Sequence, residues 1–369
     1  MNEDVFRFCD DVGPAETVHI YNPALGLKAI VVVDNVAAGP AIGGTRMEPD
    51  VTLEECVRLA RAMTLKNAAA GLPHGGAKSV IQGDPSMPLQ QKEQLVRAFA
   101  RAIGNIESYV PGPDMGTDEQ AMAWIKDEIG RSVGLPKQIG GIPLDEIGAT
   151  GFGLAVAAEV AQEYCPVQLH GARVVVQGFG SVGMHAAQYL SERGATLVGA
   201  SDSQSATVNP DGIDLGALIA HKTGGAPVGS FEGGDRLDGN DVIGIPCDIW
   251  IPAARPDVLN RDNVDRLDCK LVLQGANIPA TKEAEEILHQ RGVLSVPDFI
   301  ANAGGVICAS VEYHGGIQAA AFSAIEEKIH ANTHRVLHDA AEQNITPRAA
   351  AAAFAESNLR KAMSWQRWH

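Results

Sequence analysis

Residues 171–202 read GARVVVQGFGSVGMHAAQYLSERGATLVGASD, and this stretch decides the fold. The valines at 174–176 predict a buried strand, and apolar residues at helical spacing follow after a glycine turn. A second apolar run at 196–200 completes a strand–helix–strand unit, whose two strands run parallel. Similar apolar runs recur at 247–254, 270–277 and 292–299. We therefore expect an α/β chain with a Rossmann-type, doubly wound parallel sheet.

The turn between this strand and helix, from Gly178 to Gly183, has the pattern G-x-G-x-x-G. In this context the glycines allow a tight turn, a close approach of a pyrophosphate and close packing of the helix on the strand. Asp202 follows about 20 residues later, where a carboxylate accepts hydrogen bonds from an adenosine ribose. A 2′-phosphate would meet that negative charge, a repulsion that Ser203 softens, so we expect NAD and regard NADP as the less favoured cofactor. The expected cofactor contacts are Gly178, Phe179, Gly180, Ser181, Val182, Gly183, Asp202 and Ser203.

Composition and charge exclude several classes of protein. The formal net charge of −16 leaves no basic excess to neutralise nucleic-acid phosphates, so we expect no nucleic-acid partner. The six cysteines lack zinc-site spacing and are expected to be free thiols in a reducing compartment, and we expect no metal site. The N-terminus lacks a secretory pattern, and no apolar run approaches the roughly 18 residues of a membrane span. The sequence therefore predicts a cytoplasmic protein without a membrane partner.

A lysine on a helix is the first candidate for chemistry. Thr52 and Glu55 predict a capping box, and on the helix that follows them Lys66 falls on the apolar face. A lysine at such a position either extends past the core as a structural residue or borders a cleft.

Two further charges lie in glycine-rich segments of the first 140 residues. Lys78 ends GLPHGGAK, and Asp114 lies within PGPDMGT. Together with Lys66 and a dinucleotide fold, they suit the oxidation of an amine. One cation binds the substrate carboxylate, one lysine with a lowered pKa acts as a base, and the carboxylate transfers protons.

Seven segments carry a resemblance to a known family: GPAIGGTR, MTLKNAAAGLPHGGAKSVI, GPDMGTDEQAMAW, GATGFG, VVVQGFGSVG, VLQGANIPAT and PDFIANAGGV. They span residues 39–306, and the chain resembles the glutamate/leucine/phenylalanine/valine dehydrogenases. The resemblance implies an α/β substrate and oligomerisation domain of residues 1–143 plus about 335–369, an NAD-binding domain of residues 144–334, and an active-site cleft between them. It also implies a homo-oligomer, either a hexamer or an octamer.

The resemblance implies roles for individual residues. Lys66 would bind the substrate α-carboxylate, helped by backbone at Gly43 and Gly44. Lys78 would activate water and contact the amine, and Asp114 would act as general acid and base. Thr150 and Asn277 match positions near the nicotinamide. The implied reaction is the reversible oxidative deamination of an amino acid to its 2-oxo acid and ammonia.

The substrate side-chain pocket departs from the glutamate-specific members of this family. Ile42 stands where they have a lysine, and Ala309 stands where they have a serine. The expected pocket of Ile42, Gly112, Val306 and Ala309 is apolar and would leave a side-chain carboxylate unpaired. We expect a phenylalanine, leucine or valine type of substrate, and the small Gly112 and Ala309 favour a bulky side chain. The alternatives are a glutamate dehydrogenase with a rebuilt pocket and a catalytically silent NAD-binding sensor.

Overall fold

The structure is a computed structural model that describes residues 6–366, and its contacts divide the chain into two compact units. Unit 1 comprises Met1–Leu144, Val306–Ala321 and Phe354–His369, and unit 2 comprises Asp145–Gly305 and Phe322–Ala353. Residues 306–321 group with unit 1 because Ala309 packs beside Ile42. Residues 335–353 group with unit 2 because Arg348 is bonded to its carboxylates. These C-terminal divisions differ from the single expected boundary near residue 335.

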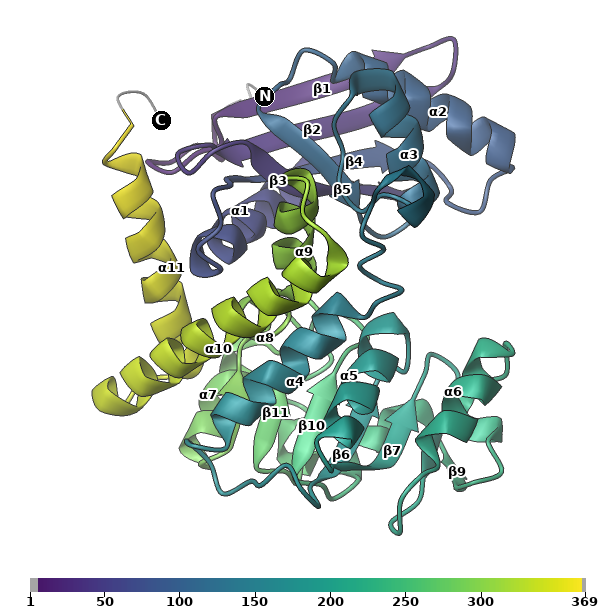
Figure 1. Cartoon of the computed structure of the whole chain (residues 1–369), viewed down its shortest axis with the longest axis vertical. Coiled ribbons are helices and arrows are strands. Elements are labelled where there is room, and N and C mark those ends of the chain that lie inside the picture. Colours follow the sequence, from purple (N-terminus) through teal and green to yellow (C-terminus); the bar gives the residue numbers. More distant parts are fainter. Residues whose placement is uncertain (1–5, 367–369) are drawn as a thin grey trace. The chain divides into compact units, whose positions relative to one another are not determined.

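Unit 1 is built on a five-stranded sheet with the strand order β1-β2-β4-β3-β5 (Figure 1). The β1–β2 and β2–β4 pairs are antiparallel, whereas β3 runs parallel to both β4 and β5. The strands are β1 Glu16–Asn22, β2 Leu27–Asn35, β3 Ala41–Glu48, β4 Gly76–Gln82 and β5 Tyr109–Pro113. The helices are α1 Leu53–Ala69, α2 Leu89–Ala102, α3 Glu119–Ile129 and most of α9 Gly304–Tyr313.

Helices cover both faces of this sheet. Along β2, Val32 packs with α1, while Val31 and Val33 pack with α2 and α3 on the opposite face. This alternation follows from the pleat of a strand, and burial on both faces explains why β2 is apolar from Ala29 to Val33. The core of unit 1 therefore lies on both sides of β2 and β4.

The start of α1 agrees with the sequence, but its buried face does not. Thr52 Oγ1 accepts a hydrogen bond from Glu55 N at 3.1 Å, which confirms the predicted cap. The buried positions are Cys56, Ala60, Thr64, Asn67 and Ala69. The expectation that Lys66 lies on the apolar face was wrong, because small and polar residues rather than leucines form the buried stripe. Lys66 is half-buried beside it.

Unit 2 contains a seven-stranded sheet with the order β12-β11-β10-β6-β7-β8-β9 (Figure 1). The strands from β12 to β7 are parallel, and β8 and β9 are antiparallel additions at one edge. The strands are β6 Arg173–Gln177, β7 Thr196–Ser201, β8 Ala206–Val208, β9 Asp235–Leu237, β10 Ile249–Pro252, β11 Leu271–Leu273 and β12 Leu294–Val296. The order reverses between β6 and β10, which confirms the doubly wound Rossmann-type sheet.

The helices of unit 2 complete the alternation predicted from the sequence. They are α4 Ala149–Ala161, α5 Ser181–Glu192, α6 Leu215–Thr223, α7 Lys282–Gln290 and α8 Asp298–Ala301. The long helices α10 Gln318–Gln343 and α11 Pro347–Met363 each contribute residues to both units. Thr346 caps α11, since its Oγ1 accepts from Ala349 N at 3.2 Å. None of the six cysteines, which all lie within residues 6–366, forms a disulfide bond. Among residues 6–366 we find no helix with the length and apolar character needed to cross a membrane.

Candidate active site

Lys78 and Asp114, far apart in the sequence, form an ion pair in unit 1. The distance from Lys78 Nζ to Asp114 Oδ2 is 2.6 Å, and the two side chains are 6% and 16% exposed. Lys78 is the third residue of β4, and Asp114 directly follows β5. Both strands flank β3, so the sheet itself brings the lysine and the carboxylate together.

Arg46 is a second cation on Asp114, which was not expected from the sequence. Arg46 Nε donates to Asp114 Oδ2 at 3.0 Å, and Arg46 Nη1 donates to Glu55 Oε1 at 2.5 Å. Burial acts to raise the pKa of Asp114, but the charges of Lys78 and Arg46 outweigh it and hold that pKa below its usual value. Asp114 is therefore a stable carboxylate. The only sequence signal for Arg46 was its place in GPAIGGTR, two residues after Gly44.

The missing Cβ of Gly44 makes room for this ion pair. A Cβ at Gly44 would lie 2.8 Å from Asp114 Cβ and 3.2 Å from Lys78 Nζ. A Cβ at Gly43 would lie only 1.7 Å from Ala77 O, so the neighbouring strand excludes any side chain there. A Cβ is excluded at Gly43 by β4 and at Gly44 by Asp114, so glycine at both positions lets the backbone of β3 lie close to the ion pair.

Lys66 lies in the last turn of α1 and is tied to the segment before Lys78 through its neighbour. Asn67 Nδ2 donates to Gly75 O at 2.7 Å, which fastens the end of α1 to the glycine turn that begins β4. His74, in that turn, is buried and forms a 3.0 Å hydrogen bond between Nδ1 and Pro40 O.

Three of the four expected pocket residues lie together. Ile42, Val110, Val133 and Ala309 form one buried apolar cluster, and Gly112 joins it through Val133. A Cβ at Gly112 would lie 3.2 Å from Val133 Cγ2. The side chain of Val133 thus takes up the room that the missing Cβ of Gly112 leaves. Gly112 therefore does not by itself enlarge the cluster, and the expectation of a bulky substrate stays a prediction. Val306, the fourth expected pocket residue, is half-buried near the start of α9, the helix that also carries Ala309.

The segment that carries Val133 is held in place by Glu312 of α9. Glu312 Oε1 accepts from Leu135 N at 3.1 Å, and Oε2 accepts from Ile142 N at 2.7 Å. Val133 N donates to Pro111 O at 2.9 Å, which fixes the segment to β5 as well. Ala309 is three residues before Glu312 on the same helix, so one helix both lines the cluster and positions Val133.

In unit 2, the glycines of the β6–α5 turn have the geometry that each position needs. Gly178 has φ +93°, and a Cβ there would lie 2.7 Å from Ala254 Cα. A Cβ at Gly183 would lie 2.2 Å from Gly178 O, so α5 packs closely on the turn. At Gly180, by contrast, no heavy atom of the described chain lies within 4 Å of such a Cβ. Gly180 also starts α5 without a side-chain cap, which leaves backbone N–H groups at a helix N-terminus for an anion.

A cavity of about 600 Å³ opens at the carboxyl ends of β6, β7 and β10, and it includes Gly178, Gly180 and Asp202. This volume lies within the usual range for small-molecule sites, and the place is the one where doubly wound sheets bind ligands. The residues present therefore fit a dinucleotide. The side chain of Phe179 is buried and only its backbone faces the cavity, whereas Ser203 is exposed there. Ser181 Oγ donates to Asp145 O at 3.0 Å, and Val182 is half-buried.

Asp202 is more enclosed than the sequence suggested. Its side chain is 6% exposed, and Lys222 Nζ of α6 lies 2.6 Å from Oδ2. Val228 N also donates to Oδ2, while Gln204 N and Ser205 N donate to Oδ1. Burial acts to raise the pKa of Asp202, but these donors outweigh it and lower that pKa to about 2. Lys222 was not expected from the sequence, because no motif marks it.

The expected nicotinamide neighbours also belong to unit 2. Thr150 is the second residue of α4, and a Cβ at Gly304 would lie 3.2 Å from Thr150 Cα. Asn277 is exposed in the loop after β11, where its Oδ1 accepts from Asn302 Nδ2 at 3.2 Å. Asn302 Nδ2 also donates to Gly275 O and Ala276 O, so one buried amide holds the whole loop.

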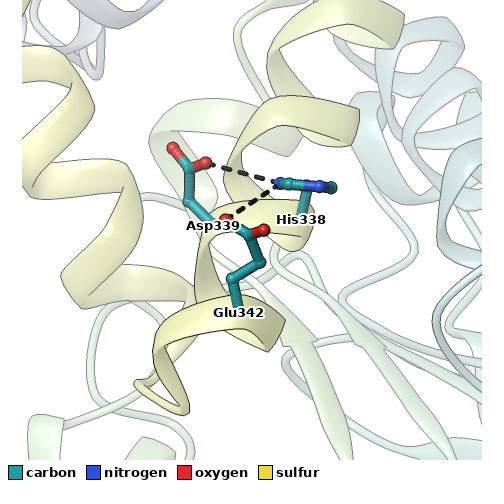
Figure 2. Close-up of side chains that lie close together, drawn as sticks. All are labelled: His338, Asp339 and Glu342. Atoms are coloured by element: carbon teal, nitrogen blue, oxygen red, sulfur yellow. Dashed lines mark ion pairs between the residues drawn. The ribbon is translucent and has the colours of Figure 1, made fainter.

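A group of possible metal ligands lies elsewhere, on α10. His338 Nδ1 is 3.6 Å from Asp339 Oδ1 and 3.8 Å from Glu342 Oε2 (Figure 2). His330, His334 and His338 recur every four residues in the sequence and therefore lie along one face of α10. However, Arg335 Nε lies 2.6 Å from Asp339 Oδ2 and neutralises one of the carboxylates. The contacts are those of an exposed, ion-paired helix face, and we assign no metal to it.

Family models match almost the whole chain. The model described as "Glutamate/Leucine/Phenylalanine/Valine dehydrogenase" matches residues 140–367. The model described as "Glu/Leu/Phe/Val dehydrogenase, dimerisation domain" matches residues 17–131. The two matches meet close to the boundary between unit 1 and unit 2 at Leu144.

Curated relatives and solved structures agree with these models. The chain is 36% identical to a glutamate dehydrogenase of Aeropyrum pernix over 90% of its own length and 85% of that protein. It is 37% identical to an NADP-specific glutamate dehydrogenase of Saccharolobus shibatae, covering 76% and 69% of the two chains. A hetero-hexameric glutamate dehydrogenase of Thermus thermophilus in its Leu-bound form superposes with a TM-score of 0.85 at 30% identity, covering 95% and 89%. L-tryptophan dehydrogenase of Nostoc punctiforme superposes with a TM-score of 0.73 at 25% identity, covering 96% and 98%.

Proposed function

Because the chain belongs to the glutamate/leucine/phenylalanine/valine dehydrogenase family, and is thus an amino-acid dehydrogenase, we propose that it reversibly oxidises an apolar L-amino acid to its 2-oxo acid and ammonia. The bound nicotinamide cofactor supplies the acceptor for the hydride that leaves the α-carbon. Water then adds to the resulting imine and ammonia departs, so one water is consumed for each amino acid. The observation that carries the chemistry is the 2.6 Å contact between Lys78 and Asp114 beside Gly44, whose missing Cβ leaves room for both side chains.

Each charged residue has one task in this proposal. Lys66 binds the substrate α-carboxylate, with the backbone of Gly43 and Gly44 beside it. Lys78 Nζ holds the amine and orients the attacking water. Asp114 Oδ2 accepts and returns the protons of the imine and carbinolamine steps, and its ion pair with Lys78 supports this role because a proton passes over a single hydrogen bond.

The cofactor contacts are proposed in unit 2. The turn from Gly178 to Gly183 and the N-terminus of α5 hold the pyrophosphate, while Thr150 and Asn277 lie near the nicotinamide. The open space at Gly180 and the uncapped start of α5 support this placement. The sequence favours NAD, whereas two of the relatives are named for NADP.

The apolar cluster around Ile42 supports an apolar side chain on the substrate. A side-chain carboxylate placed against Ile42 and Ala309 would lose its hydration without gaining a partner, which costs several kcal/mol. Because Val133 fills the space beside Gly112, we propose valine or leucine rather than phenylalanine.

Glutamate is the second candidate because curated relatives from three archaea, at 36%, 37% and 39% identity, are all named glutamate dehydrogenases. A panel of L-amino acids that includes valine, leucine, phenylalanine and glutamate separates the two, with formation of the reduced nicotinamide as the signal. Each amino acid is tested with NAD and with NADP. Activity on valine or leucine with little on glutamate is the expected result. A preference for glutamate would contradict the pocket argument and leave the chemistry intact.

Replacement of Lys78 tests the catalytic assignment. Lys78→Ala should lower kcat by about 10³-fold or more, within reach of what an acid–base group contributes, while nucleotide binding persists. Lys28→Ala, which changes an exposed lysine on the adjacent strand β2, should retain full activity. Full activity of Lys78→Ala would remove the assigned role, and inactivity of the unaltered chain on every amino acid would favour the silent NAD-binding sensor.

A further inference from the structure

The carboxylate expected to recognise the cofactor ribose has no acceptor site to spare. A carboxylate offers about four lone-pair sites. Asp202 uses its two oxygens to accept from Gln204 N, Ser205 N, Val228 N and Lys222 Nζ, at distances from 2.6 to 3.1 Å. A ribose hydroxyl that donates to Asp202 would have to displace one of them. The carboxylate is a structural residue that shapes the loop after β7.

Donors rather than acceptors face the cavity at this place. Lys222 Nζ makes one hydrogen bond among those described for residues 6–366, to Asp202, and an ammonium group has three N–H donors. The Lys222 side chain is 27% exposed and lines the cavity. Ser203, Gln204 and Asn240 line it beside Lys222.

The charges around this end of the cavity are balanced. Asp202 and Asp238 are offset by Lys222 and Arg255, all four of which line the cavity. Arg255 is exposed and takes part in no ion pair within the described chain, so its charge is available to a ligand. A dianionic group therefore does not meet the unopposed negative charge that the sequence suggested. It meets a lysine with two unused donors.

We propose that the site binds the 2′-phosphate of NADP(H), with Lys222 as its ligand, and that NADP is preferred to NAD. The inference rests on the proposed function, because it assumes that the β6–α5 turn holds a nicotinamide dinucleotide. A phosphate only accepts hydrogen bonds and bears a charge opposite to that of Lys222, so the pair is charge-assisted. The 2′-hydroxyl of NAD needs an acceptor that Asp202 does not have free.

Binding of two nucleotide fragments to the full chain tests the assignment without any turnover. Isothermal titration compares 2′,5′-ADP with 5′-AMP, which differ only by the 2′-phosphate, and then NADP with NAD. For the unaltered chain we expect 2′,5′-ADP to bind about tenfold or more tightly than 5′-AMP, as one charge-assisted hydrogen bond provides. Lys222→Met should lower the affinity for 2′,5′-ADP by about 10- to 100-fold and should strengthen the binding of both 5′-AMP and NAD, because it frees one acceptor site on Asp202 for the 2′-hydroxyl that both carry.

Two matched variants control for charge and folding. Lys222→Arg keeps the cation and should retain tight binding of 2′,5′-ADP. Lys270→Met removes another lysine of unit 2 that is paired with an aspartate, Asp248 at 2.7 Å, but at the amino end of β10. It should leave both affinities unchanged. Thermal melting of each variant verifies that the fold is retained.

The possible failures are distinct. Equal binding of 2′,5′-ADP and 5′-AMP to the unaltered chain overturns the 2′-phosphate site. An equal loss of both nucleotides in Lys222→Met, with the fold retained, shows that Lys222 shapes the cavity and overturns its role as a phosphate ligand. If neither fragment nor either cofactor binds the unaltered chain, the cofactor site of the proposed function fails, and this inference fails with it.

Discussion

Asp114 holds its charge between two cations, and this determines which proton transfers it can perform. Lys78 and Arg46 both contact Oδ2, at 2.6 and 3.0 Å. A carboxylate with a lowered pKa is a proton acceptor before it is a donor. In the proposed mechanism, Asp114 must therefore take a proton from the reaction before it can return one. The ion pair suits the direction that oxidises the amino acid, in which protons are released.

Arg46 should set the acid limit of the reaction. Arg46→Gln removes one of the two cations that lower the pKa of Asp114, so this pKa rises. Because the carboxylate is the active form, the acid limb of kcat/KM against pH should move to higher pH. The measurement is a pH–rate profile with the best amino acid of the panel. Arg97→Gln, which changes an arginine of α2 paired with Glu93 and Asp127, is the control. An unmoved acid limb would show that another group limits the rate at low pH.

Val133 should control the size of the accepted side chain. Val133→Ala removes two methyl carbons from the cluster beside Gly112, and each buried methylene changes discrimination by roughly 10- to 200-fold. We expect kcat/KM for phenylalanine to rise relative to valine by at least about tenfold. Val228→Ala, at a buried valine of unit 2, should leave this ratio unchanged. The pocket assignment fails if the two variants have the same substrate profile.

The residues that sequence reasoning missed share one property, since each acts through a partner distant in the chain. Arg46 meets Asp114 across 68 positions, and Lys222 meets Asp202 across 20. Val133 enters the cluster through a loop without a recognisable pattern. Lys78 and Asp114 were visible as candidates because glycines surround them, but their contact was not, because spacing along a sequence does not fix the register of a sheet. Sequence reasoning thus found charged residues and missed what neutralises them.

At the level of elements, local sequence signals predicted the strands and helices well. They did not indicate to which unit each C-terminal helix belongs. The run from β6 to β7 follows from valine content, glycines and helical spacing, and the caps at Thr52 and Thr346 follow from side-chain chemistry. Whether α9 and α10 belong to unit 1 or unit 2 depends on the core that buries them. The spacing of the apolar residues along either helix does not reveal this. The small antiparallel strands β8 and β9 have three residues each and leave no usable pattern.

Helix α11 is joined to the sheet of unit 2 by a buried ionic network. Arg348 donates to Glu285 Oε2 at 2.5 Å, to Asp298 Oδ1 at 2.8 Å and to Gln274 Oε1 at 2.8 Å. The two carboxylates are only 5% and 7% exposed. Asp298 Oδ2 also accepts from Ile278 N, a residue held at φ +49° next to Asn277. The network therefore anchors both a helix and the loop proposed to lie near the nicotinamide.

Loss of Arg348 should be costly for stability. Arg348→Met leaves two buried carboxylates without a cation, which destabilises a fold by about 3–5 kcal/mol. Arg335→Met on α10 removes an arginine that is paired with Asp339 and 64% exposed, and should leave the free energy of unfolding almost unchanged. Urea denaturation followed by circular dichroism compares the two. Adding Glu285→Gln and Asp298→Asn to Arg348→Met should recover part of the loss, because no buried charge then remains unpaired. Equal effects of Arg348→Met and Arg335→Met would mean that water reaches the network.

For the molecule as a whole, the residues proposed for catalysis and those proposed for cofactor binding lie in different units. The charged residues proposed for catalysis lie in unit 1, and the glycine turn and Asp202 lie in unit 2. This division was predictable because each set occupies a continuous block of sequence with its own motifs. The surface charge also belongs to this scale. A net charge of −16 keeps copies of the chain apart unless a specific interface overcomes it.

Such an interface is expected at the edge of the unit 1 sheet. β1 is an edge strand whose outer backbone groups are unpaired within the sheet order, and Tyr21 on it is 68% exposed. The dimerisation-domain model covers this strand. We expect a homo-oligomer of six or eight copies of the 38.8 kDa chain, measured by mass photometry over a dilution series. Tyr21→Asp adds a like charge to each copy at the edge and should shift the distribution to smaller species. A species of 38.8 kDa at all concentrations would refute the oligomer, and an unchanged distribution in Tyr21→Asp would place the interface elsewhere on the surface.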